Sequence, residues 1–142
     1  MLTAAVWIAR IVLAGLFFYA GVVKAGASEA FATTIAGFSL LPPGLIELFA
    51  FALPWVEMLA AILILIPVTS RAGADLISCL LGTFILAILW ALSQGLVIDC
   101  GCFGEGTPTV AKMLETAFRD VILLVLSVGL ARRRTGRFLP IT

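Results

Sequence analysis

Four long apolar stretches follow one another along the chain, at about residues 4–24, 43–67, 75–98 and 108–131. A helix needs about 20 predominantly apolar residues to cross the hydrocarbon core of a lipid bilayer, and each stretch reaches that length. The pattern therefore predicts four transmembrane helices.

Proline residues indicate where two of these helices begin and end. Pro43 and Pro67 bracket the second stretch, at positions that suit a helix start and a helix stop. Thr107 is expected to cap the fourth helix, with Pro108 at its first helical position. The first half of that helix is polar, since it carries Lys112, Glu115, Arg119 and Asp120. We expect its early turns to protrude into water or to face the bundle interior.

A shorter helix is predicted between the first two spans, within residues 26–42. Ser28 is expected to cap a helix that begins at Glu29. Three apolar residues recur in it at the spacing of one helical face: Phe31, Ile35 and Phe38. Because this segment is too short to span a bilayer, we expect an interfacial helix on the outer side.

The composition agrees with a membrane environment. Hydrophobic residues make up 63% of the chain and charged residues 12%, with a mean hydropathy of +1.22, whereas a soluble domain carries about 25% charged residues. With so few charged residues, the lipid bilayer is the expected environment of the chain. The net charge of +1 gives no indication of a nucleic-acid partner. The predicted fold class is all-α: an integral membrane four-helix bundle with a short outer interfacial helix, forming one domain over residues 1–142.

The basic residues predict the orientation in the membrane. Arg71 lies between the second and third spans, and four more arginines follow the fourth span: Arg132, Arg133, Arg134 and Arg137. By the positive-inside rule both places are cytoplasmic. With four spans, both termini are then cytoplasmic, and the Cys100–Pro108 loop faces the periplasm of a bacterial inner membrane, where disulfides persist.

The leading chemical candidates are two cysteines in that loop, Cys100 and Cys102, separated only by Gly101. The chain has no histidine, which removes imidazole bases and the usual zinc and haem ligands. The two thiols can form a tight disulfide, pass electrons to a partner or hold a soft metal such as Cu(I). The absence of histidine and of a nearby methionine counts against the metal, so no metal site is assigned.

Cys79 is treated separately from this pair. In a continuous third helix it lies about 30 Å from Cys100, far beyond the separation that a disulfide permits. We therefore expect Cys79 to be a small buried apolar residue.

Charged residues inside the apolar stretches form a second group of candidates, because such residues are costly in a bilayer unless they are paired. Depth along the helices predicts an ion pair between Arg10 and Glu57. These two residues, with Trp55 beside Glu57, are also candidates for contacting a quinone head group or relaying a proton. Three further charged residues are expected nearer the outer face, beneath the cysteine loop: Glu47, Lys24 and Arg119.

Several motifs resemble those of a known family. The first helix carries a spaced pattern of Arg10, Gly15, Phe18, Gly21 and Lys24 that resembles the opening of DoxX-like membrane proteins. The likeness extends through Pro54-Trp55-Val56-Glu57, Arg71, Asp99-Cys100-Gly101-Cys102-Phe103-Gly104 and Arg119-Asp120. Together these motifs resemble the MauE family of methylamine utilisation within that group. The resemblance implies a four-helix membrane protein that takes part in thiol redox chemistry. It further implies a role in the maturation of the disulfide-rich small subunit of methylamine dehydrogenase, alongside a thioredoxin-like partner.

The favoured hypothesis is accordingly a membrane thiol–disulfide redox protein. Gly101 supplies the backbone freedom needed to close the very small disulfide ring, and strain in such a ring makes the bond easier to reduce. Quinone is the natural electron source or sink, because no ligand set for haem or an iron–sulfur cluster is visible. The alternatives are an assembly or docking subunit with a structural disulfide, a copper-binding protein, and a transporter. The last is disfavoured because 142 residues form only half of most transporter folds.

Overall fold

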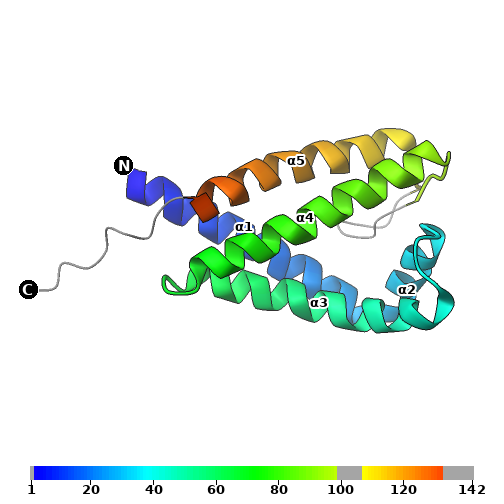
Figure 1. Cartoon of the computed structure of the whole chain (residues 1–142), viewed down its shortest axis with the longest axis horizontal. Coiled ribbons are helices and arrows are strands. Elements are labelled where there is room, and N and C mark those ends of the chain that lie inside the picture. Colours follow the sequence, from blue (N-terminus) through cyan, green and yellow to red (C-terminus); the bar gives the residue numbers. More distant parts are fainter. Residues whose placement is uncertain (1, 99–106, 133–142) are drawn as a thin grey trace, which may run out of the picture.

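The computed structural model describes residues 2–98 and 107–132. Regular structure in these two ranges consists of five helices: α1 (Leu2–Gly26), α2 (Ser28–Gly37), α3 (Pro43–Leu65), α4 (Ser70–Ser93) and α5 (Val110–Arg132). The four long helices lie side by side as a bundle, and the short α2 lies at one end of it (Figure 1). The predicted all-α class is confirmed.

Three helices have the length and apolar composition of membrane spans: Thr3–Gly26, Pro43–Leu65 and Ser70–Ser93. The protein is therefore a multi-pass membrane protein. The fourth long helix, α5, has 23 residues and packs against α4, but its first half carries the charged residues noted above. A fourth membrane crossing by α5 stays a prediction.

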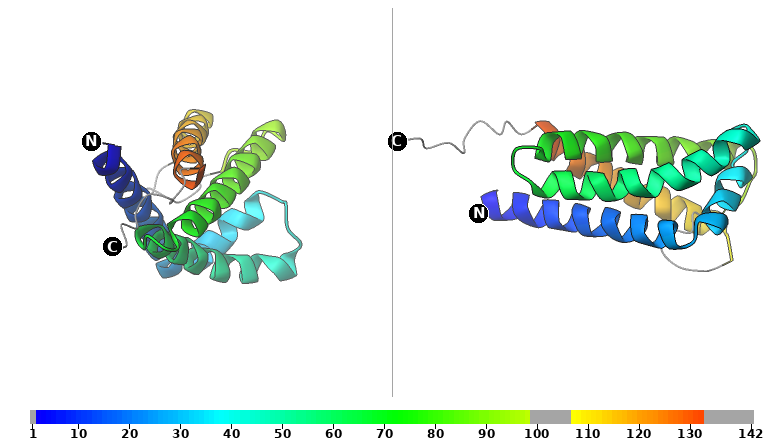
Figure 2. Two further views of the ribbon diagram at one scale, coloured as in Figure 1. Left: turned by 60° about the vertical axis from the view of Figure 1, so that its left-hand side comes forward. Right: turned by 90° about the horizontal axis from the view of Figure 1, so that it is seen from below.

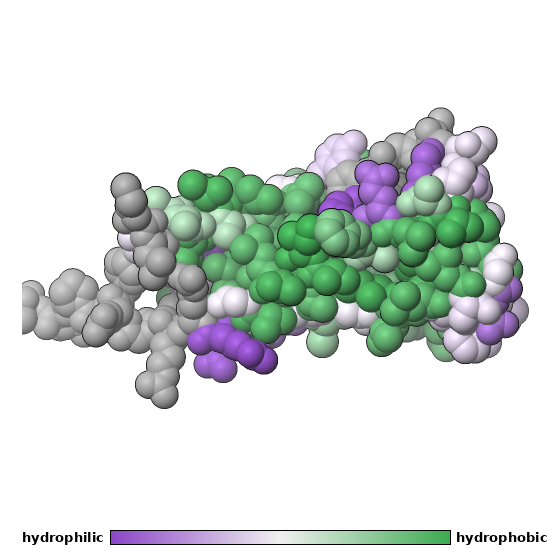
Figure 3. Space-filling view, turned by 90° about the horizontal axis from the view of Figure 1, so that it is seen from above, coloured by the Kyte–Doolittle hydropathy of each residue, from purple (hydrophilic) through white to green (hydrophobic). Residues whose placement is uncertain are grey.

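The outer surface of the bundle is apolar. In Figure 3, green apolar side chains form a band along the face shown, and purple polar side chains gather at its lower left, along its upper right edge and at its right-hand end. Large side chains such as Ile8, Phe51, Leu86 and Val125 are mostly exposed. A surface of this kind is expected where lipid takes the place of water.

Two glycines allow the helices to approach closely. A Cβ at Gly21 would lie 2.8 Å from the carbonyl oxygen of Pro54 in α3. At Gly73 it would lie 2.5 Å from the backbone nitrogen of Ile64. Small residues at such crossings are the usual means of packing helices in membranes, where close van der Waals contact replaces the hydrophobic effect. These two contacts fix α3 against α1 and α4.

The bounds of α4 differ from the prediction of residues 75–98. Ser93 ends the helix because Gly95 follows with φ +70°. The N–H of Leu96 donates to the Ala91 carbonyl at 2.9 Å, and that of Gly95 donates to the Leu92 carbonyl at 3.1 Å. This is the Schellman arrangement that terminates many helices at glycine.

The tight turn before α4 sets its earlier start. The Ser70 hydroxyl donates to the Pro67 carbonyl at 2.9 Å, and the Thr69 hydroxyl donates to the Leu63 carbonyl at 3.0 Å. These bonds satisfy one carbonyl in the last turn of α3 and one in the connection that follows it. The third helix therefore begins at Ser70 rather than at residue 75, and the second ends at Leu65 rather than at Pro67.

Two predicted caps are wrong. The Lys112 N–H donates to the hydroxyl of Thr109 at 3.3 Å, so Thr109 takes the capping position predicted for Thr107. Ser28 is the first residue of α2 and not its cap; Ala27 holds that position without a side-chain hydrogen bond. In both places the capping position lies one or two residues from the predicted one, a difference that the local pattern does not resolve.

Candidate functional site

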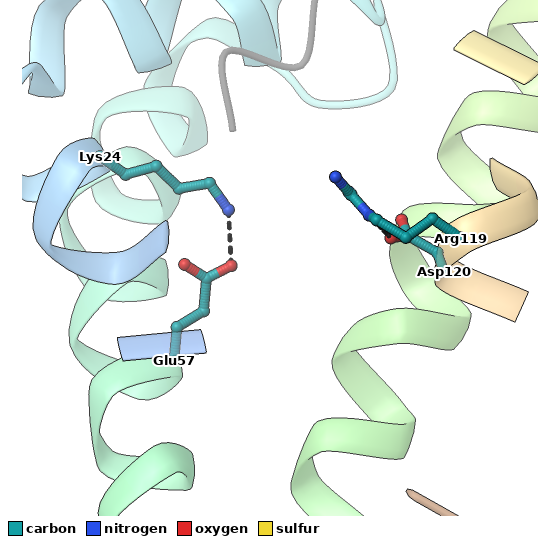
Figure 4. Close-up of polar contacts among 4 residues, drawn as sticks. All are labelled: Lys24, Glu57, Arg119 and Asp120. Atoms are coloured by element: carbon teal, nitrogen blue, oxygen red, sulfur yellow. Dashed lines mark hydrogen bonds and ion pairs between the residues drawn. The ribbon is translucent and has the colours of Figure 1, made fainter. Parts of the chain in front are cut away.

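A cavity of about 250 Å³ lies inside the bundle, at the end where α2 is found. All five helices contribute to its wall, and most of the lining side chains are apolar. Its charged lining residues, within the described part of the chain, are Lys24, Glu57, Arg119 and Asp120. These four side chains are drawn in Figure 4.

Lys24 and Glu57 form a buried ion pair. The Lys24 Nζ lies 2.6 Å from Glu57 Oε1, and the two side chains are 3% and 0% exposed. Lys24 comes from the last turn of α1, where a cation also complements the helix dipole. Glu57 lies in α3 one turn after Pro54. A buried charge is tolerated when it is paired and hydrogen-bonded, and each residue supplies that partner for the other.

The Lys24 ammonium also contacts two aromatic rings. It lies 5.2 Å from the centroid of the Phe31 ring in α2 and 4.7 Å from that of Phe84 in α4. Both distances are within the range of cation–π attraction. One ammonium group from α1 thus interacts with α2, α3 and α4 at a single point, which ties the short helix to the bundle.

The second carboxylate oxygen of Glu57 differs from most buried polar atoms in having no described hydrogen-bond partner. Oε2 is buried and has no hydrogen-bond partner in the described residues. Buried polar atoms are nearly always hydrogen-bonded, since leaving one unpaired costs free energy. The cavity wall therefore contains an acceptor that a donor could satisfy.

A second charged pair lies on α5. Arg119 Nη2 lies 3.0 Å from Asp120 Oδ1, and Asp120 is buried. Figure 4 shows the Lys24 and Arg119 side chains pointing toward one another from opposite sides of the site. The four charges sum to zero. The electrostatics of the cavity thus favour a neutral guest over an ion.

The predicted ion pair between Arg10 and Glu57 is wrong. Arg10 Nη2 donates to the Ser70 hydroxyl at 3.2 Å, and its guanidinium lies 5.4 Å from the Trp7 ring centroid. The error lies in the helix register: the blue N-terminal end of α1 projects beyond the turn between α3 and α4 (Figures 1 and 2). Arg10 is therefore level with that turn, and Lys24, about 21 Å further along α1, reaches Glu57.

The structure brings together only part of the predicted outer group. Lys24 and Arg119 both line the cavity, whereas Glu47 is exposed and does not belong to its lining. Trp55 is 57% exposed, outside the cavity, with its ring centroid 6.4 Å from that of Phe51.

Sequence reasoning did not assign Asp120, Phe31 or Phe84 to the site. Asp120 could have been recognised from the sequence, because it is a carboxylate next to Arg119 inside an apolar stretch. Phenylalanines are too common in membrane helices to stand out. Their role depends on where the Lys24 ammonium lies.

The two loop cysteines, Cys100 and Cys102, lie outside the described residues. Cys79 is exposed on the outside of the bundle, so the prediction that it is buried is wrong. Its neighbours Ile77 and Leu80 take the inward-facing positions of α4. The Ile98 N–H donates to the sulfur of Met113 at 3.4 Å, so a methionine contacts the last described residue before the cysteine segment.

These features define a class: a multi-pass helical membrane protein with a neutral, charge-paired cavity inside its bundle. A protein-family model described as methylamine utilisation protein MauE matches residues 2–132, and the chain belongs to this family. No solved structure matches the chain.

Curated relatives carry the same description. The methylamine utilization protein MauE of Methylorubrum extorquens is 33% identical over 113 residues, which cover 79% of this chain and 60% of the relative. That of Paracoccus versutus is 33% identical over 126 residues, covering 88% of this chain and 67% of the relative. The chain thus spans roughly three fifths to two thirds of the length of these relatives.

Proposed function

We propose that this protein is a membrane thiol–disulfide redox protein that acts in methylamine utilisation. Cys100 and Cys102 are its reacting pair, and a thioredoxin-like periplasmic protein is its exchange partner. The pathway is supported by the family and by the names of its curated relatives. The chemistry is supported by the spacing of the two thiols and by the residues that precede them.

The observation that carries the proposal is the packing of Ile98, two residues before Cys100. Ile98 packs in one apolar cluster with Ile88, Ala91, Met113 and Phe38. Ile88 and Phe38 also line the charged cavity. Ile98 is the last described residue before the cysteine segment, and it therefore lies at the cavity end of the bundle.

The exchange itself is ordinary dithiol chemistry. One thiolate attacks a disulfide of the partner and forms a mixed disulfide; the second thiol then displaces the partner's other sulfur. One S–S bond forms between Cys100 and Cys102, and the partner's bond is reduced to two thiols; the same steps run in reverse. A membrane electron carrier then resets the pair, and quinone is our candidate for it.

The test is to trap the mixed disulfide in cells. Of the two single variants, Cys100→Ser and Cys102→Ser, one keeps the attacking thiol and lacks the resolving one, so a covalent adduct with the partner should accumulate in that variant and be identified by mass spectrometry. Cys79→Ser is the matched control. Cys79 is exposed on the outer surface of the bundle and is not part of the reacting pair, so this substitution should leave the amount of adduct unchanged.

Purified protein equilibrated in glutathione buffers gives the second readout. The pair should titrate within the glutathione range, where about 30 mV corresponds to a tenfold change in equilibrium constant. A bridge that resists reduction throughout would indicate a structural disulfide and an assembly role. Two thiols that never pair but retain stoichiometric copper would indicate a metal site. Either result contradicts the proposal.

A further inference from the structure

We infer that the cavity is the binding site for the head group of a quinone, and that Lys24 and Glu57 are the residues that bind it. The inference rests on the proposed redox function, because it places the electron carrier of that function in a defined part of the bundle. It draws on the size of the cavity, its opening, its charge and its unpaired acceptor.

The size and walls suit an aromatic head group. An apolar protein cavity of about 150 Å³ is enough to hold a benzene ring, and this one measures about 250 Å³. Its wall includes the rings of Phe31 and Phe84. Leu40 and Phe49, which also line it, are 47% and 44% exposed. The cavity therefore reaches the apolar outer surface near the connection of α2 and α3, where a lipid tail could leave.

The charged residues of the cavity favour a neutral ligand that carries hydrogen-bonding oxygen atoms. Lys24 and Glu57 cancel one another, as do Arg119 and Asp120. An anion or a cation would therefore enter without a compensating charge, which is costly in such a site. A quinone is neutral in both its fully oxidised and its fully reduced form.

The Lys24–Glu57 pair complements both of these forms. The ammonium is a donor and suits the carbonyl oxygen of a quinone. Glu57 Oε2 is an acceptor with no partner in the described residues, and it suits the hydroxyl of a hydroquinone. The pair therefore offers the donor that the oxidised ring needs and the acceptor that the reduced ring needs.

The electron balance closes between the two sites. Oxidation of the Cys100 and Cys102 thiols forms one S–S bond and releases two electrons and two protons. Reduction of one quinone to hydroquinone takes up two electrons and two protons, one proton on each oxygen. The reverse exchange balances in the same way.

The test uses a photoreactive azidobenzoquinone with a short alkyl tail, added to the full-length protein in lipid nanodiscs. Irradiation should label peptides that carry cavity residues, and an excess of unlabelled quinone should suppress the label. Ala87→Phe places bulk in the cavity wall and should reduce the label about tenfold or more. Leu86→Phe is the matched control, because this neighbouring residue is exposed and outside the lining; it should leave the label unchanged.

A second variant tests the polar contacts. Lys24→Met combined with Glu57→Leu removes both charges while keeping similar volumes, so no unpaired charge stays buried. The double variant should retain the melting profile of the wild type and lose about tenfold or more in quinone affinity, since it loses hydrogen bonds to charged groups.

Three results would overturn the inference: label confined to lipid-facing residues, label unaffected by Ala87→Phe, or equal suppression by a saturated fatty alcohol. The last would identify a plain lipid cavity. Labelling of a Cys100→Ser/Cys102→Ser variant separates the two claims, because it requires the cavity alone. If the cavity is labelled but the cysteines fail to cycle in glutathione, the proposed function is wrong and the quinone site is supported. If the cysteines cycle but the cavity is not labelled, only this inference fails.

Discussion

Glu57 depends on Lys24 for its place inside the bundle, and this dependence can be measured residue by residue. Glu57→Gln removes the counter-charge of a 3% exposed ammonium. Breaking a buried pair by removing one partner typically costs about 3–5 kcal/mol, whereas removing both costs far less. We expect Glu57→Gln to lower the free energy of unfolding by that amount, and Lys24→Met in the same chain to recover most of it.

Arg10→Gln serves as the control for this rescue. Arg10 bonds to Ser70 and lies well away from Glu57, so it should not compensate for Glu57→Gln. Titration with denaturing detergent, followed by circular dichroism, measures all four proteins. Rescue by Arg10→Gln instead of Lys24→Met would contradict the observed pairing.

At the scale of the helices, the crossing of α1 and α3 depends on Gly21. Alanine there would place its Cβ 2.7 Å from Met58 Cγ and 2.8 Å from the Pro54 carbonyl oxygen, so the helices must move apart. Overpacking of this kind typically costs about 1–3 kcal/mol. We expect Gly21→Ala to destabilise the bundle in the same detergent titration.

Gly15→Ala makes the identical change on the same helix, where no described atom beyond the helix's own local backbone lies within 4 Å of the added Cβ. Alanine is the better helix former by about 1 kcal/mol, so this control should be neutral or stabilising. Equal effects of the two substitutions would show that helix propensity, rather than the close approach, governs position 21.

For the molecule as a whole, the testable property is its orientation. Arg71 and Arg132 lie at the end of the bundle opposite α2, so by the positive-inside rule we expect that end in the cytoplasm and the cysteine segment in the periplasm. A membrane-impermeant maleimide added to intact, mildly reduced cells should label Cys100 and Cys102. Cys79, exposed on α4 about 14 Å from its start, should face lipid and stay unlabelled.

Wild type and a Cys79→Ser variant should give the same labelling, and cell lysis should not increase it. Protection of both loop cysteines in intact cells, with labelling only after lysis, would reverse the orientation.

The sequence by itself determined the class of protein, the number of long helices and the family. Apolar runs of about 20 residues have one common structural outcome, because a bilayer leaves no water to satisfy backbone groups outside a helix. The motifs around Pro54-Trp55-Val56-Glu57 and the two cysteines likewise indicate the MauE family, to which the chain belongs. Helix ends were less predictable: Gly95 ended α4 earlier than its apolar run suggested.

Only the tertiary structure decided which charges meet. Lys24, Glu57 and Arg10 were all recognisable as charged residues within apolar stretches. Their pairing depends on the offset between α1 and α3, and sequence periodicity fixes the face of a helix but not its axial position against a neighbour. That offset is set by the close approach of Gly21 to Pro54, a contact between residues far apart in the chain. The buried Lys24–Glu57 pair forms at this offset, and the cavity beside it is completed by residues of all five helices.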